Sequence, residues 1–204
     1  LELDKKVLTG KLENGLTYYV MHNEKPAQRA DFYIVTNVGA VQEAPDQDGL
    51  AHFLEHMCFN GTKHFPGKGI ISYMESIGCA FGANINAGTG YEMTSYMLNN
   101  VPVTREGIID SSLLILFDWS AFVTNDPAEI DAERGVILEE KRTRDGYQWR
   151  QQVALMKTLF KGSALENVSG CVIKHSGIFD VWEMDSFPHY RDIEGVACVH
   201  LLDL

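Results

Sequence analysis

Cysteine is scarce and scattered in this chain of 204 residues, which contains only Cys58, Cys79, Cys171 and Cys198. None of the four belongs to a C-x-x-C pair, so the sequence indicates neither a zinc knuckle nor a disulfide framework. A free cysteine behaves as a small hydrophobic side chain that favours burial. We therefore expect all four to lie in the core.

Long hydrophobic runs and an excess of positive charge are also absent. No stretch approaches the roughly 20 apolar residues of a membrane-spanning helix, and residues 1–6 lack the apolar core of a signal peptide. Seventeen basic against 28 acidic residues give a net charge of −11, which disfavours nucleic acid and anionic membranes as partners. The chain has no starting Met, and we expect it to be a fragment of a longer protein.

The order of hydrophobic patterns and turn residues predicts an α+β fold, in which helices back a mostly antiparallel sheet. Asn14-Gly15 predicts a hairpin turn, Asp126-Pro127 predicts a helix start, and Asp48 is expected to cap an earlier helix. Without a repeat or a linker, residues 1–204 are expected to form a single domain. The expected strands cover residues 7–12, 16–21, 30–38, 80–87 and 93–98, and the expected helices cover 49–59, 69–77, 102–119 and 128 to beyond 141.

The most informative pattern is H-x-x-E-H, formed by His52, Glu55 and His56. At about 100° per residue of helix, His56 lies about 40° from His52 and Glu55 about 60° to the other side. All three side chains can therefore point into one cavity. Imidazole nitrogens are good zinc ligands, and a carboxylate that does not bind the metal can accept a proton from water. The pattern thus predicts a zinc site with its own general base.

A catalytic zinc usually has three protein ligands, so a third ligand must come from elsewhere in the chain. The acidic segment 129–140 is the best source. Glu133 and Glu140 are seven residues apart, which places them about 20° from each other on one helix face and about 10 Å apart. One of the two can bind the metal while the other orients a histidine. Spacing alone does not say which.

The segments 49–63 and 133–140, together with Asn14-Gly15-Leu16-Thr17-Tyr18-Tyr19 and Phe65-Pro66-Gly67, resemble the insulinase/pitrilysin metallopeptidases. The pattern is most similar to that of the large bacterial members from Bacteroides-like organisms. The resemblance covers about residues 7–162. It implies the N-terminal domain of that family, with a processing-peptidase-like two-layer α/β fold.

This resemblance implies a role for each residue of the site. His52, His56 and Glu140 are the expected zinc ligands, Glu55 is the expected general base, and Glu133 is the expected supporting carboxylate of the catalytic set. The implied reaction is hydrolysis of peptide bonds in peptides or unfolded polypeptides. The implied partners are a peptide substrate and further C-terminal domains or a companion subunit, and the implied location is the bacterial periplasm or cell envelope.

The resemblance also implies that substrate adds as a strand to a sheet edge at Asn86, Ala87 and Gly88. Strand addition uses main-chain groups and tolerates varied sequences. Relatives commonly carry an aromatic residue and Thr after Asn-Ala, whereas Gly88-Thr89-Gly90 follows here. Glycines loosen an edge and remove a side-chain wall, so this part of the site departs from the family pattern.

Two other functions fit parts of the sequence. S-ribosylhomocysteine lyase also uses H-x-x-E-H, with a Cys ligand that Cys171 would supply. A noncatalytic binding or assembly subunit of the same fold is the second alternative, although intact His52, Glu55 and His56 argue against it.

Overall fold

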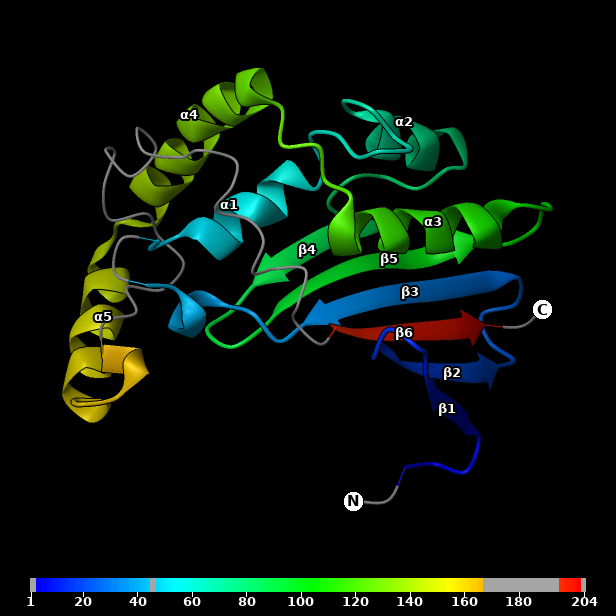
Figure 1. Cartoon of the computed structure of the whole chain (residues 1–204), viewed down its shortest axis with the longest axis horizontal. Coiled ribbons are helices and arrows are strands. Elements are labelled where there is room, and N and C mark those ends of the chain that lie inside the picture. Colours follow the sequence, from blue (N-terminus) through cyan, green and yellow to red (C-terminus); the bar gives the residue numbers. More distant parts are fainter. Residues whose placement is uncertain (1–2, 45–46, 167–194, 203–204) are drawn as a thin grey trace.

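A six-stranded sheet forms one layer of the structure (Figure 1). The computed structural model describes residues 3–44, 47–166 and 195–202, the last of these as backbone only. The strands lie in the order β1-β2-β6-β3-β5-β4, and β4 is therefore at an edge. Strands β2 and β6 are parallel, whereas all other neighbours are antiparallel. The strands are β1 (Val7–Lys11), β2 (Thr17–Asn23), β3 (Arg29–Thr36), β4 (Ile85–Thr89), β5 (Thr94–Pro102) and β6 (Gly195–Leu202).

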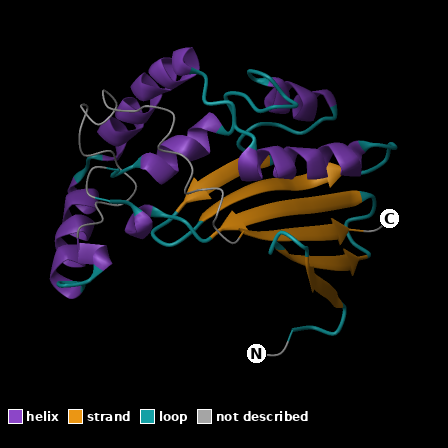
Figure 2. Cartoon of the chain, in the orientation of Figure 1, coloured by secondary structure: helices purple, strands orange, loops and turns teal. Residues whose placement is uncertain are grey.

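Helices cover one face of this sheet, as Figure 2 shows. The helices are α1 (Leu50–Met57), α2 (Gly69–Ser76), α3 (Ile108–Ala121), α4 (Pro127–Arg144) and α5 (Tyr147–Leu159), with short 3-10 turns at Ala40–Gln42 and Ala164–Glu166. The core fills the space between the layers: Phe32 and Leu98 from the sheet pack with Met74 and Ile115 from the helices. The predicted α+β fold, a mostly antiparallel sheet backed by helices, is confirmed. The count of one domain stays a prediction.

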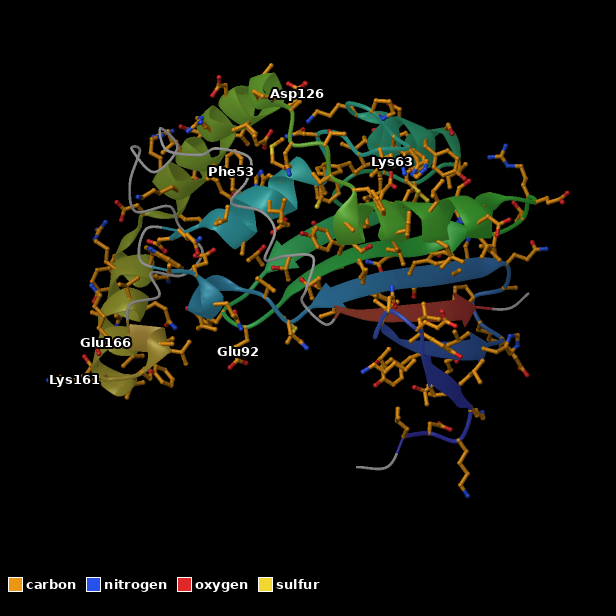
Figure 3. The ribbon with its side chains drawn as sticks, viewed as in Figure 1. Phe53, Lys63, Glu92, Asp126, Lys161 and Glu166 are labelled. Atoms are coloured by element: carbon orange, nitrogen blue, oxygen red, sulfur yellow. The ribbon has the colours of Figure 1, made fainter. Side chains whose placement is uncertain are left out.

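The predicted hairpin and two predicted helix ends are present. Strands β1 and β2 pair across the turn, although only Gly15 adopts a positive φ there. Helix α4 begins as expected, because the Asp126 side chain accepts a hydrogen bond from the Ala128 amide at 2.8 Å and Pro127 takes the first position (Figure 3). Gly78, at φ +86°, follows the end of α2. Local turn chemistry was therefore a reliable guide at these positions.

Three predicted boundaries are wrong by four or more residues. The strand expected to end at residue 98 continues to Pro102, and the other two boundaries fail beside a glycine in the left-handed region. The strand predicted from residue 80 begins at Ile85, because Gly82 has φ +81° and residues 80–84 form a turn in which Asn84 Oδ1 accepts the Ala80 amide. The helix predicted from residue 102 begins at Ile108, after Gly107 at φ +82°. Apolar patterning did not reveal these two glycine turns.

The predicted cap of helix α1 is also wrong. Gly49, not Asp48, occupies the N-cap of α1, with φ +95° and no side-chain cap of its own. The carboxylate of Glu43 accepts the amides of Gly49 and Ala51, each at 2.7 Å. A carboxylate at this position satisfies amides that the helix leaves unpaired and interacts favourably with its dipole. The start of α1 is thus held by the side chain of Glu43, which precedes the helix.

Other expectations had mixed outcomes. Helix α5 and strand β6 are not among the elements expected above. Cys58 and Cys79 are buried free thiols, as expected, whereas Cys171 and the side chain of Cys198 lie outside what is described. Within the described part of the chain, no helix is both long and apolar enough to cross a membrane.

Candidate metal centre

Helix α1 carries the three residues of the H-x-x-E-H pattern on one buried face. His52 and Glu55 are only 7% and 8% exposed. The helix lies between α4 and strand β4, and the labelled Phe53 marks its position in Figure 3. Phe53 and Met57 anchor the side of α1 that faces α4. Burial of this short helix against two elements therefore fixes the directions of both histidines.

Helix α4 carries Glu133 and Glu140 on the side that faces the histidines of α1. Ile137 is 2% exposed and packs with Phe53 and Met57, and Ile130 joins that cluster one heptad earlier. Each glutamate follows one of these isoleucines by three residues, which places it on a neighbouring strip of the helix. Glu139 points away and pairs with Arg142 in solvent. The apolar contact thus turns both predicted carboxylates toward the histidines.

His52, His56 and Glu140 converge on one point. The two Nε2 atoms are 3.2 Å apart, and Glu140 Oε2 lies 3.5 Å from His52 Nε2 and 3.4 Å from His56 Nε2. Two ligands of a tetrahedral zinc ion with bonds of about 2.0–2.1 Å are separated by about 3.3 Å. The three atoms match one face of such a tetrahedron. Among the described residues, this is the one group of three that is close enough to hold a metal ion.

Glu133 contacts His56 from the opposite side of the ring. Its Oε1 lies 2.8 Å from His56 Nδ1. A carboxylate at that distance favours the tautomer with hydrogen on Nδ1, which leaves the lone pair of Nε2 directed at the other two ligand atoms. The second oxygen, Oε2, accepts a hydrogen bond from Asn60 Nδ2 at 2.6 Å. The structure therefore places Glu133 behind a histidine and Glu140 beside both.

The contact between His56 and Glu133 shifts the pKa of both groups. Burial by itself would lower the pKa of His56, but the hydrogen bond to Glu133 and the nearby carboxylates outweigh it, and the pKa is raised. The same hydrogen bond from His56 lowers the pKa of Glu133 against the effect of its burial, and Asn60 and Lys68 act in the same direction. Glu133 is thus held as an anion.

Glu55 lies in the same cleft as His52, His56 and Glu140 but makes a separate contact. Its Oε2 accepts the hydroxyl of Thr89, on the edge strand β4, at 2.7 Å. Burial raises the pKa of Glu55, and the Thr89 hydrogen bond and the charge of His56 only partly oppose that effect. A carboxyl pKa closer to neutrality suits a general base that must both take and release a proton.

A cleft of about 580 Å³ joins these groups to the sheet edge. Asn86, Ala87 and Gly88 line it from β4, the side of which facing away from β5 has no neighbouring strand among those described. The Asn86 side chain accepts the Ala87 amide at 2.9 Å. The predicted substrate-binding residues and the predicted metal ligands therefore border one space.

Sequence reasoning missed four residues that contact the site. Thr89 binds Glu55, Asn60 binds Glu133, Lys68 binds Asn60, and Arg144 pairs with Glu140 Oε1. One signal was available for Asn60, because it follows His52 and His56 at the same four-residue interval. Arg144 also follows Glu140 at the four-residue spacing of a helical ion pair. Thr89 and Lys68 are brought in by a strand and a loop, so no local spacing points to them.

Two helical histidines, a carboxylate beside them from a second helix and a buried glutamate, in a two-layer α+β domain, are the arrangement expected of a metallopeptidase domain with the H-x-x-E-H pattern. The sequence pattern of Insulinase (Peptidase family M16) matches residues 18–171. The chain belongs to this family. The predicted family is thereby confirmed, although its match covers residues 18–171 and not the expected 7–162. Membership of this family disfavours the lyase alternative, whose expected Cys171 ligand lies outside the described residues.

Three similar proteins are informative. The chain is 39% identical over 154 residues to the probable zinc protease PqqL of Escherichia coli, which covers 76% of this chain. It is 36% identical over 154 residues to a PQQL-like zinc protease of Arabidopsis thaliana, again over 76% of this chain. The crystal structure of the first half of the periplasmic protease PqqL superimposes with a TM-score of 0.85 at 31% identity, over 100% of this chain and 44% of that one. The chain spans only 16% of the length of these two relatives.

Proposed function

We propose that this chain is the zinc-binding catalytic domain of a metalloendopeptidase. His52, His56 and Glu140 hold the zinc, Glu55 is the general base, and Glu133 orients His56. The single observation that carries the proposal is the triangle of two Nε2 atoms and Glu140 Oε2, with sides of 3.2 to 3.5 Å, in the same cleft as the buried Glu55. The zinc protease names of relatives at 39% and 36% identity support the choice of metal and reaction class.

The chain's own groups suggest how the reaction proceeds. When bound, zinc supplies Lewis-acid polarisation of the scissile carbonyl and of a water molecule. Glu55 accepts a proton from the attacking water and delivers it to the leaving amine. The Thr89 hydroxyl donates to Glu55 Oε2 and holds the carboxylate in the cleft. Glu133 keeps the Nδ1 proton of His56 in place, so that Nε2 remains a ligand.

The peptide is expected to add to the free edge of β4 beside Asn86, Ala87 and Gly88. Main-chain hydrogen bonds to an edge strand hold an extended peptide without demanding one sequence. The position of that edge on the cleft with Glu55 supports this role. We therefore propose peptides or unfolded polypeptides as substrates.

The proposal also covers the remaining domains of the protein and its location in the cell. Relatives are much longer than this chain, so we propose that further C-terminal domains, or a companion subunit, complete the substrate chamber. The solved PqqL structure is described as that of a periplasmic protease, which supports a periplasmic or cell-envelope location for a bacterial protein of this type.

Two measurements test this function together. Zinc content and cleavage of a fluorogenic peptide library should be compared between this chain alone and the full-length protein. We expect both forms to bind one zinc and the full-length protein to cleave far faster. Zinc binding without cleavage by the full-length protein would favour the noncatalytic subunit, and failure of both forms to bind zinc would contradict the proposed site.

A further inference from the structure

Asn60 occupies a buried position at which both ends of its amide are used. It is 3% exposed and lies three residues beyond the end of α1. Its Nδ2 donates to Glu133 Oε2 at 2.6 Å, and its Oδ1 accepts from Lys68 Nζ. A buried amide with a carboxylate on one side and an ammonium on the other has only one favourable orientation. Flipping it would place oxygen against oxygen and NH2 against the ammonium group.

Lys68 enters this arrangement from outside the metal centre. It is an exposed residue that immediately precedes α2, and it lines the cleft together with Arg144. Arg144 pairs directly with the expected ligand Glu140. Lys68 instead contacts the amide of Asn60, which stands between it and Glu133. A continuous chain of polar contacts therefore runs from Lys68 through Asn60 and Glu133 to His56 Nδ1.

We propose that Asn60 and Lys68 are positioning residues of the metal centre, which hold Glu133 in register with His56 and thereby strengthen zinc binding. The inference rests on the proposed zinc site. Glu133 extends from α4 and His56 from α1, so a third contact, from Asn60 in the loop after α1, holds the carboxylate against His56 Nδ1. Removal of partners behind a metal-bound histidine typically weakens metal affinity about 10- to 100-fold.

The test measures the zinc dissociation constant of the full-length protein by chelator competition. Asn60→Leu keeps the approximate volume and removes both hydrogen bonds, and we expect affinity to fall about 10- to 100-fold. Lys68→Met removes only the charge that orients the amide, and a loss of about threefold to tenfold is expected. Lys68→Arg should restore near-normal affinity. The matched control is Lys63→Met, because Lys63 lies in the same loop but stacks over Phe122, 4.8 Å from the ring centroid, and its affinity should not change.

A double-mutant cycle separates positioning from a merely structural effect. If Lys68 acts through Glu133, then Lys68→Met should cause no further loss of zinc affinity in a Glu133→Ala background. The same holds for Asn60→Leu, and if that variant does not fold, Lys68→Met decides because its side chain is exposed.

Additive losses in the cycle, or equal affinities of Lys68→Met and Lys63→Met, would overturn the inference while leaving the zinc site intact. A wild-type protein that binds no zinc would instead contradict the proposed function itself. The two failures are therefore distinguishable in one set of measurements.

Discussion

Two histidine–carboxylate pairs among the described residues have nearly the same geometry in different surroundings. His56 Nδ1 lies 2.8 Å from Glu133, and His64 Nδ1 lies 2.6 Å from Asp118. The Asp118 carboxylate on α3 is fully buried and also accepts the Thr62 hydroxyl at 2.6 Å and the His64 amide at 2.9 Å. All three donors come from the loop that follows α1. This second pair therefore fastens a loop to α3.

The difference between the pairs lies in what faces the other ring nitrogen. His56 Nε2 faces His52 and Glu140, whereas the described residues offer no comparable set of ligands around His64. A histidine held by a carboxylate is thus an oriented histidine and nothing more. Two further potential ligand atoms at the spacing of zinc ligands make the first pair, and not the second, part of the proposed metal site.

The largest expected effect is loss of zinc when one of the proposed ligands that face His56 Nε2 is removed. His52→Ala or Glu140→Ala should weaken zinc affinity by at least about 100-fold, because removing a ligand costs more than removing its outer partner. His64→Ala is the matched control and should retain zinc. Metal analysis after dialysis measures the outcome, and parallel zinc loss in His64→Ala would abolish the distinction between the pairs.

The next effect concerns catalysis rather than binding. Glu55→Gln keeps the size of the side chain but cannot accept a proton, so the kcat of the full-length protein should fall by about 10²- to 10⁴-fold while zinc content stays unchanged. Peptide cleavage and metal analysis on the same sample give both values. Retained peptidase activity in this variant would refute the assignment of Glu55 as base.

Stability should respond most strongly at the second pair. Asp118→Ala leaves the Thr62 hydroxyl and the His64 donors without their buried acceptor, at a cost of about 1–3 kcal/mol for each unsatisfied group. We expect the free energy of unfolding in chelator to fall by about 2–4 kcal/mol, with little change in zinc affinity. Glu133→Ala should show the reverse pattern. Denaturant unfolding and zinc titration of both variants distinguish the two pairs. A loss of zinc affinity in Asp118→Ala as large as that in Glu133→Ala would contradict this distinction.

The smallest expected effect contrasts two threonines that donate to carboxylates at similar distances, Thr89 to Glu55 at 2.7 Å and Thr62 to Asp118 at 2.6 Å. Thr89→Val should lower kcat about tenfold, since a hydrogen bond to a charged group stabilises by about 1.5–3 kcal/mol, and Thr89→Ser should restore it. Thr62→Val should lower stability and leave kcat unchanged. Equal kinetics in the two valine variants would remove Thr89 from the site.

The sequence allowed prediction of the fold class and of most elements, because periodicity and turn residues act locally. Boundaries failed where a glycine in the left-handed region interrupts an apolar run, as at Gly82 and Gly107. The cap of α1 failed for another reason. Glu43 accepts the Gly49 and Ala51 amides, and contacts between residues six and eight positions apart follow neither the helix nor the strand repeat.

The sequence by itself determined the ligand types and their directions within each helix, because a repeat of 3.6 residues places His52 with His56 and Glu133 with Glu140. It paired the two glutamates without ranking them. Only the tertiary structure decided which carboxylate lies beside both Nε2 atoms and which lies behind His56, since that depends on how α4 packs on α1 through Ile137. Thr89, Asn60 and Lys68 likewise reach the centre only through the folded chain, because the contacts that gather them join segments far apart in sequence.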